Sequence, residues 1–154
     1  LVDELHENPD TLELVVANAL LTVGEAENDT APLIREHLLT QHVVAERDGA
    51  VVGFVSGYVR PDSPETLMVW QVAVDADQRG HGLAGRMLDH LAEQVPDVTM
   101  LETTITDDNA ASRALFARFA RIRDAQHEET DLFVKAHFPD EGHDPEVLHR
   151  IGPF

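Results

Sequence analysis

The feature that most constrains the fold is a glycine-rich loop between a β-branched strand and an amphipathic helix. Residues 69–74 read Val-Trp-Gln-Val-Ala-Val, residues 75–82 read Asp-Ala-Asp-Gln-Arg-Gly-His-Gly, and apolar residues then recur at helical spacing over 83–95. Glycines let backbone amides approach a ligand closely, and a helix start offers unpaired N–H groups and a positive dipole end. Arg79 adds a formal charge there. The segment therefore favours a pyrophosphate-binding turn over the alternative, a tight turn without a ligand.

The remaining patterns predict one domain, residues 1–154, of the α/β (α+β) class with a mixed sheet and helices on both faces. Pairs of β-branched runs around an Arg-Asp-Gly-Ala turn predict a hairpin, and an Asp-Asp-Asn cluster predicts a helix cap. In chain order, we expect a helix from Asp10-Thr11 to Val23, a short helix from Thr30 to about Leu39, strands over 43–46, 51–59 and 67–74, a helix over 83–95, a strand over 98–106, a helix from Asn109 to about Arg121, and a tail of strand and loop.

The excess of acidic over basic residues bears on which ligands the protein can bind. The chain carries 11 basic and 29 acidic residues, for a net charge of −18. Nucleic-acid binding is disfavoured because it needs clustered Lys and Arg. The acidity is consistent either with a protein kept soluble by self-repulsion or with adaptation to a salty cell interior. Cysteine is absent, which excludes disulfides, thiolate zinc sites and a cysteine nucleophile.

Hydropathy predicts no membrane association. No stretch approaches the roughly 18 apolar residues needed to span a bilayer, and residues 1–20 show no basic-then-apolar signal pattern. We therefore expect a cytoplasmic protein. Because the chain begins with Leu1 and not methionine, we do not expect residue 1 to be the natural start.

The loop motif resembles a known family. Arg79-x-x-Gly82-x-Ala84, after a Val-Ala-Val strand, is similar to the acetyl-CoA pyrophosphate loop of GNAT N-acetyltransferases. The resemblance implies a mostly antiparallel GNAT-like sheet and acetyl-CoA as cosubstrate. It also implies that the preceding strand lends backbone groups to the pantetheine arm and that a second cofactor segment opens the next helix. The implied cofactor-binding residues are Val72, Val74, Arg79, Gly80, Gly82, Ala84, Gly85, Asn109 and Ser112.

Longer motifs resemble one branch of that superfamily, the diaminobutyrate acetyltransferases of ectoine biosynthesis. They are the segments 69–74, 101–106 and 109–116, the tail motif Gly-His-x-x-Glu-Val-Leu over 142–148, and the ending Arg-Ile-Gly-Pro over 150–153. The resemblance extends from about residue 41 to the end. It implies that a small cationic amino acid, L-2,4-diaminobutyrate, is acetylated at its side-chain nitrogen by direct attack on the thioester. A homodimer is also implied.

Two departures from the family keep alternatives open. Many GNAT enzymes place a tyrosine near the CoA sulfur, but this chain has Phe116 there, and its only tyrosine is Tyr58. Residues 21–29 also differ from the family pattern in a region that contributes to the acceptor pocket. The alternatives are a GNAT enzyme for another small amine or amino acid, and an acetyl-CoA-binding module without turnover.

Four residues are candidates for the acceptor site. Trp70 is either a wall of the acceptor pocket or a core residue, and Glu102 is a carboxylate that could attract a diamine. The tail motif implies that His143 binds the acceptor and that Glu146 binds or deprotonates its amine; the alternative is that both are surface residues. An ammonium of pKa about 10.4 must lose a proton before it can attack a thioester, so a carboxylate base suits the reaction. The six-residue spacing of His137, His143 and His149 matches no metal site, so no metal is expected.

Overall fold

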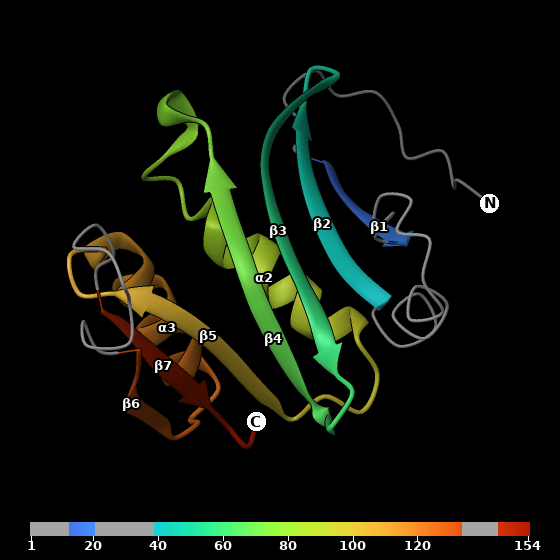
Figure 1. Cartoon of the computed structure of the whole chain (residues 1–154). Helices are drawn as coiled ribbons and strands as arrows, with labels where there is room; N and C mark the ends of the chain where they lie inside the picture. Colours follow the sequence, from blue (N-terminus) through green and yellow to red (C-terminus); the bar gives the residue numbers. More distant parts are fainter. Residues whose placement is uncertain (1–12, 21–38, 134–144) are drawn as a thin grey trace, which may run out of the picture.

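The computed structural model describes residues 13–20, 39–133 and 145–154, and these build one twisted seven-stranded sheet. The strand order is β1-β2-β3-β4-β5-β7-β6, and every neighbouring pair is antiparallel except β4 and β5. Figure 1 shows the strands in this order. The strands are β1 (Glu13–Leu20), β2 (Leu39–Arg47), β3 (Ala50–Arg60), β4 (Ser63–Val74), β5 (Met100–Thr106), β6 (His127–Phe133) and β7 (Glu146–Ile151).

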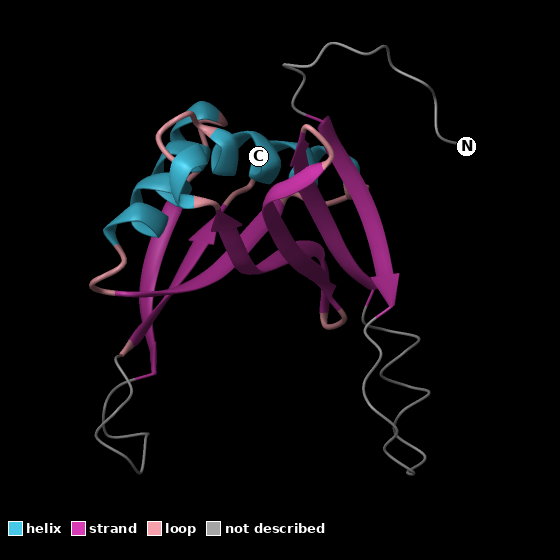
Figure 2. Ribbon diagram, turned by 90° about the horizontal axis from the view of Figure 1, so that it is seen from above, coloured by secondary structure: helices cyan, strands magenta, loops and turns pink. Residues whose placement is uncertain are grey.

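Both described helices, α2 (Leu83–Gln94) and α3 (Ala110–Ile122), lie on the same side of the sheet (Figure 2). A short 3-10 turn, Ala76–Gln78, precedes α2. The core between this face and the helices contains Met87, Leu88 and Leu91 of α2 and Phe116 and Phe119 of α3, all nearly inaccessible to water. One apolar stripe on each helix thus buries itself against the same sheet face.

The sheet opens into a fork at its centre. β4 and β5 are parallel partners only from Thr66 to Met68, opposite Met100 to Glu102, although both strands continue well beyond. Figure 1 shows the two strands diverging towards their carboxyl ends. The backbone of the second half of β4 is therefore released from its β5 neighbour and free to face another partner.

Most predicted elements are confirmed, with boundaries shifted by a few residues. The β2–β3 hairpin turns at Asp48 and Gly49, which both have positive φ, as the Arg-Asp-Gly-Ala sequence indicated. The predicted helix over 11–23 is wrong, because residues 13–20 form β1. Adjacent β-branched Val15 and Val16 pair with Val44 and Val43 of β2, so tertiary pairing overrides a weak helical periodicity.

The predicted short helix over 30–39 lies outside the described residues, apart from Leu39, which begins β2. Helices on both faces of the sheet therefore stay a prediction. None of the helices in the part of the chain that the structure describes is long and apolar enough to cross a membrane.

Candidate active site

A β-bulge on β4 shapes the inner edge of the fork. Ser56 of β3 lies opposite Gln71 and the next residue, Gly57, lies opposite Val69, so Trp70 is an extra residue in the ladder. The bulge turns two consecutive side chains, Trp70 and Gln71, outward, and the Trp70 residue is 68% exposed. The sole tryptophan is therefore not a core residue, which leaves it available for a pocket wall.

A cleft of about 590 Å³ lies between the end of β4, the loop after it, and the first turns of α2 and α3. All nine residues predicted to bind the cofactor line it: Val72, Val74, Arg79, Gly80, Gly82, Ala84, Gly85, Asn109 and Ser112. Residues separated by up to forty positions in sequence thus meet on one surface. Sequence reasoning did not single out the other lining residues, Ala73, Gln78, Leu83, Ala111, Leu115 and Arg118.

The loop presents backbone donors at the start of α2. Gly80 and Gly82 adopt φ values of 80° and 72°, which favour glycine, and no side chain caps the helix that Gly82 begins. Arg79 is held at the loop by its Nε, which donates to the carbonyl of Val74 at 3.0 Å. The result is an uncapped helix N-terminus beside a guanidinium, an arrangement suited to a diphosphate.

The second wall of the cleft is the first half of α3. The Asn109 side chain accepts a hydrogen bond from the Ser112 N–H at 3.0 Å, so the predicted cap is confirmed. Ala111, Ser112, Leu115 and Arg118 all line the cleft, and their spacing places them on one helical stripe. That stripe is the signal by which Leu115 and Arg118 could have been found from the sequence.

The described acceptor candidates, Trp70, Glu102 and Glu146, lie on the other face of the sheet. Leu101 and Ile105 of β5 belong to the core under the helices, so strand alternation places Glu102, Thr104 and Thr106 on the open face. Glu146 is the direct β7 partner of Thr106 and shares that face. Trp70 and the half-buried Glu146 thus stand on opposite arms of the fork, both on the face away from the helices.

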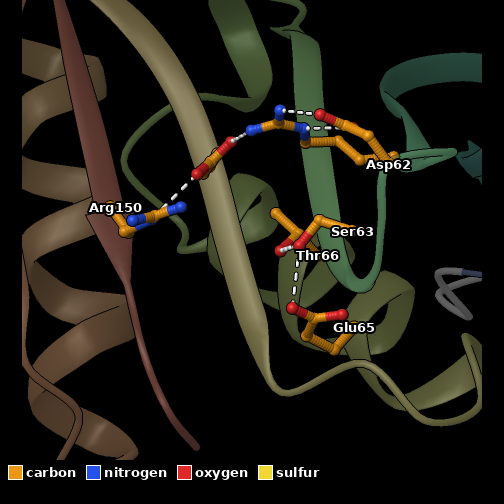
Figure 3. Close-up of polar contacts among 7 residues, drawn as sticks. Asp62, Ser63, Glu65, Thr66 and Arg150 are labelled. Atoms are coloured by element: carbon orange, nitrogen blue, oxygen red, sulfur yellow. Dashed lines mark hydrogen bonds and ion pairs between the residues drawn. The ribbon is translucent and has the colours of Figure 1, made fainter.

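Glu102 is buried between two arginines. Its two carboxylate oxygens accept from Arg60 Nη1 of β3 at 2.7 Å and from Arg150 Nε of β7 at 2.9 Å. Arg60 also pairs with exposed Asp62 (Figure 3). Asp62 and Glu102 together raise the pKa of Arg60 above its usual value. Glu102 does not line the cleft, and these contacts make it an ionic tie between three strands at the base of the fork.

The chain's single tyrosine does not line the cleft. His143, the remaining predicted site residue, lies outside the described residues. Phe116 occupies the helix position where many GNAT enzymes have a tyrosine, and it is buried in the core. Tyr58 lies on β3 opposite Met68 and is not among the residues that line the cleft. No hydroxyl of tyrosine is therefore available in this cleft.

One histidine cluster was not predicted. His127, Glu129 and His149 bring one potential metal-ligand atom each to within 4.8 Å of one another, unlike the trio considered from the sequence. His127 Nε2 and His149 Nδ1 are hydrogen-bonded at 2.9 Å, and Glu129 pairs with Arg113 at 3.3 Å. Burial, with help from His127 and Arg113, holds the pKa of His149 below its usual range against the opposing effect of Glu129. The other ring nitrogen of His149, Nε2, is buried and has no hydrogen-bond partner among the described residues.

Comparison with known proteins finds similar sequences and structures among acetyltransferases. The sequence model of the acetyltransferase (GNAT) family matches residues 12–120. The L-2,4-diaminobutyric acid acetyltransferase of Streptomyces coelicolor is 54% identical over 122 residues, covering 77% of this chain and 72% of that protein. The enzyme of the same name from Marinococcus halophilus is 44% identical over 114 residues, covering 73% of this chain and 66% of that protein.

A solved structure is similar over nearly the whole chain. It is a diaminobutyrate acetyltransferase from Paenibacillus lautus in complex with its substrate L-2,4-diaminobutyric acid and coenzyme A. It superposes with a TM-score of 0.72 at 30% identity, covering 93% of this chain and 96% of that one. The nourseothricin acetyltransferase structure, at 20% identity and a TM-score of 0.59, shares the fold.

Proposed function

This chain belongs to the GNAT acetyltransferase family, and we propose that it transfers the acetyl group of acetyl-CoA to the side-chain amine of L-2,4-diaminobutyrate. The observation that carries the proposal is the 54% identity to a diaminobutyric acid acetyltransferase over 77% of the chain, joined to a cleft lined by every residue the cofactor motif implies. The Paenibacillus lautus enzyme, whose structure holds both diaminobutyric acid and coenzyme A, supports the same acceptor and the same coenzyme.

The cleft at the start of α2 has groups that suit acetyl-CoA. The uncapped start of α2 and the Arg79 guanidinium offer hydrogen-bond donors and positive potential to a diphosphate. Beyond Met68, the β4 backbone has no β5 partner, so the amide groups of Val72 and Val74 can bond to an extended pantetheine arm. This positive pocket is needed because the protein as a whole carries a net charge of −18, which repels an anionic cosubstrate.

The acceptor half must deliver a neutral amine. An ammonium of pKa about 10.4 is neutral only about once in 10³ molecules near pH 7.4, which costs about 4 kcal/mol. Glu146, on the open face of the sheet, removes this proton directly or through a water molecule. Trp70, which the bulge turns towards the same face, forms one wall of the acceptor pocket. The tail motif implies that His143 also binds the acceptor.

The acetyl group then moves in one displacement. The neutral amine nitrogen forms a bond to the thioester carbonyl carbon, and the carbonyl oxygen gains negative charge. As this charge returns, the carbon–sulfur bond breaks, and the nitrogen gives up its second proton, which neutralises the departing thiolate directly or through water. Backbone N–H groups near Val72 stabilise the oxyanion, an effect often worth about 3 kcal/mol. Because Phe116 stands where the resemblance implies a tyrosine, the sulfur leaves as a thiolate without a tyrosine proton donor.

A thiol-release assay over a panel of amines tests this function. The purified protein is incubated with acetyl-CoA and diaminobutyrate, ornithine, lysine, diaminopropionate or a monoamine, and the free thiol of CoA is measured. We expect the highest kcat/KM with diaminobutyrate and mass-spectrometric identification of the Nγ-acetyl product. Preference for another amine would assign a different acceptor. If calorimetry detects binding of acetyl-CoA but no amine causes release of the CoA thiol, the protein is a binding module without turnover.

A further inference from the structure

Coenzyme A carries two separate anionic groups, the diphosphate and the 3′-phosphate of its ribose. The loop at the start of α2 has the donors for one of them, and this inference rests on the proposed function in taking that group to be the diphosphate. The second group is a dianionic phosphomonoester, which is recognised best by a guanidinium. Of the residues that line the cleft, only Arg79 and Arg118 are cationic.

Arg118 reaches the cleft from a different element than Arg79, which lies in the loop before α2. It comes from α3, at the end of the stripe that lines the cleft, and it reaches the first turn of α2. A Cβ added to Gly85 would lie 2.6 Å from Arg118 Nη1, so the missing side chain at position 85 makes room for this guanidinium. The close approach of the Arg118 guanidinium to Gly85 thus results from the packing of α2 against α3.

The guanidinium of Arg118 is only loosely engaged by the protein. Its nearest carboxylate, Asp89, is 3.7 Å away, and Asp89 is hydrogen-bonded at shorter range to Arg123. Arg123 is also stacked over the Phe119 ring at 3.9 Å, and its side chain is only 15% exposed. The Arg118 side chain is 44% exposed, so Arg123 has the structural role and Arg118 keeps donors for a ligand.

We infer that Arg118 is the binding subsite for the 3′-phosphate of coenzyme A. Arg79 and the α2 amides hold the diphosphate on one side of the cleft, and Arg118 holds the phosphomonoester on the other. Two separate cationic contacts give a highly acidic protein the means to select the 3′-phosphorylated cosubstrate over nucleotides that carry a diphosphate alone.

Titration calorimetry with CoA and with 3′-dephospho-CoA tests this assignment. We expect the wild-type protein to bind CoA about tenfold more tightly than dephospho-CoA, the effect of one charge-assisted contact. In Arg118→Gln, the Kd for CoA rises to that of dephospho-CoA, while the Kd for dephospho-CoA does not change. Arg121→Gln, an exposed arginine on the same helix outside the cleft, is the matched control and keeps the tenfold preference.

Each other outcome has a distinct meaning. Equal affinity of the wild-type protein for the two ligands overturns the 3′-phosphate subsite but leaves acetyl transfer intact. A similar loss of affinity for both ligands in Arg118→Gln overturns it too, because the arginine then contacts the diphosphate. No binding of either ligand by the folded wild-type protein contradicts the proposed function itself. Circular dichroism of each variant verifies that the fold is retained.

Discussion

The two faces of the forked sheet are built in different ways. On the helix face, the residues that line the cofactor cleft, three glycines among them, come from two short segments, 72–85 and 109–118. On the open face, the acceptor candidates Trp70 and Glu146 come from strands β4 and β7, which do not pair with each other. On the proposed function, the first face binds the cosubstrate and the second carries the choice of acceptor.

This difference teaches where change can be tolerated. A backbone cradle depends on φ angles and on the absence of side chains, so only residues compatible with those angles preserve it. A side-chain pocket on a separate set of strands can be altered without disturbing the cradle. Variants on the two faces should therefore separate cofactor affinity from turnover.

The largest effect is expected from Glu146→Gln. Removing the proposed base should lower kcat/KM for diaminobutyrate by at least tenfold, within the ~10²–10⁴-fold range of general-base contributions, while the Kd for acetyl-CoA stays the same. Glu128→Gln, opposite Arg150 on the neighbouring strand β6, removes the same charge from the same face as a control. Unchanged kinetics in Glu146→Gln, or an equal loss in both variants, would discard the base assignment.

Glu102→Gln tests the tie at the base of the fork. Breaking a buried charge pair leaves two guanidinium groups without their shared carboxylate, so the free energy of unfolding should fall by about 2 kcal/mol. Both arginines are partly exposed, which places the loss below that of a fully buried pair. Urea denaturation measures it. Asp62→Asn, which removes the exposed partner of Arg60, should change stability little, and comparable losses in the two variants would contradict the structural role of Glu102.

Gly82→Ala tests the backbone cradle. An L-residue at φ 72° costs about 1 kcal/mol, so the loop relaxes and the Kd for acetyl-CoA should rise about fivefold. Gly49→Ala is the matched control, because Gly49 has φ 75°, lies in the β2–β3 turn and, like Gly82, has no neighbour that a Cβ would strike. If both variants, or neither, weaken calorimetric binding, the geometry at position 82 is not what binds the cofactor.

The smallest effect concerns His149. Because its pKa is lower in the folded chain than the ordinary 6.5, the unfolded chain binds more protons between these two values. The stability attributable to this residue is therefore complete above about pH 6.5 and falls as the pH drops towards the folded pKa. Urea midpoints between pH 5 and 8 should show a shallower decline in His149→Gln than in the wild-type protein. His81→Gln, an exposed histidine, should keep the wild-type decline.

Local patterns predicted most elements because each had its own signal. The hairpin needed only an Asp-Gly pair between β-branched runs, and the α3 cap needed only Asn109 three residues before Ser112. The strand β1 was mistaken for a helix because its apolar residues fit either period until β2 was available to pair with them. The helical stripe places Arg118 on the same face of α3 as Ser112, but its contact with Gly85, 33 positions away in sequence, follows only from the tertiary structure.

The sequence by itself determined the cofactor loop, the class of the fold and the family, since glycine positions, β-branched runs and helical periodicity act over a few neighbouring residues. Only the tertiary structure decided that β4 has its bulge at Trp70 and that Glu146 shares a face with Trp70. It also decided that the Glu102 carboxylate is ion-paired with two arginines. These depend on which strands pair and in what register. A shift of one residue would send every side chain of a strand to the opposite face.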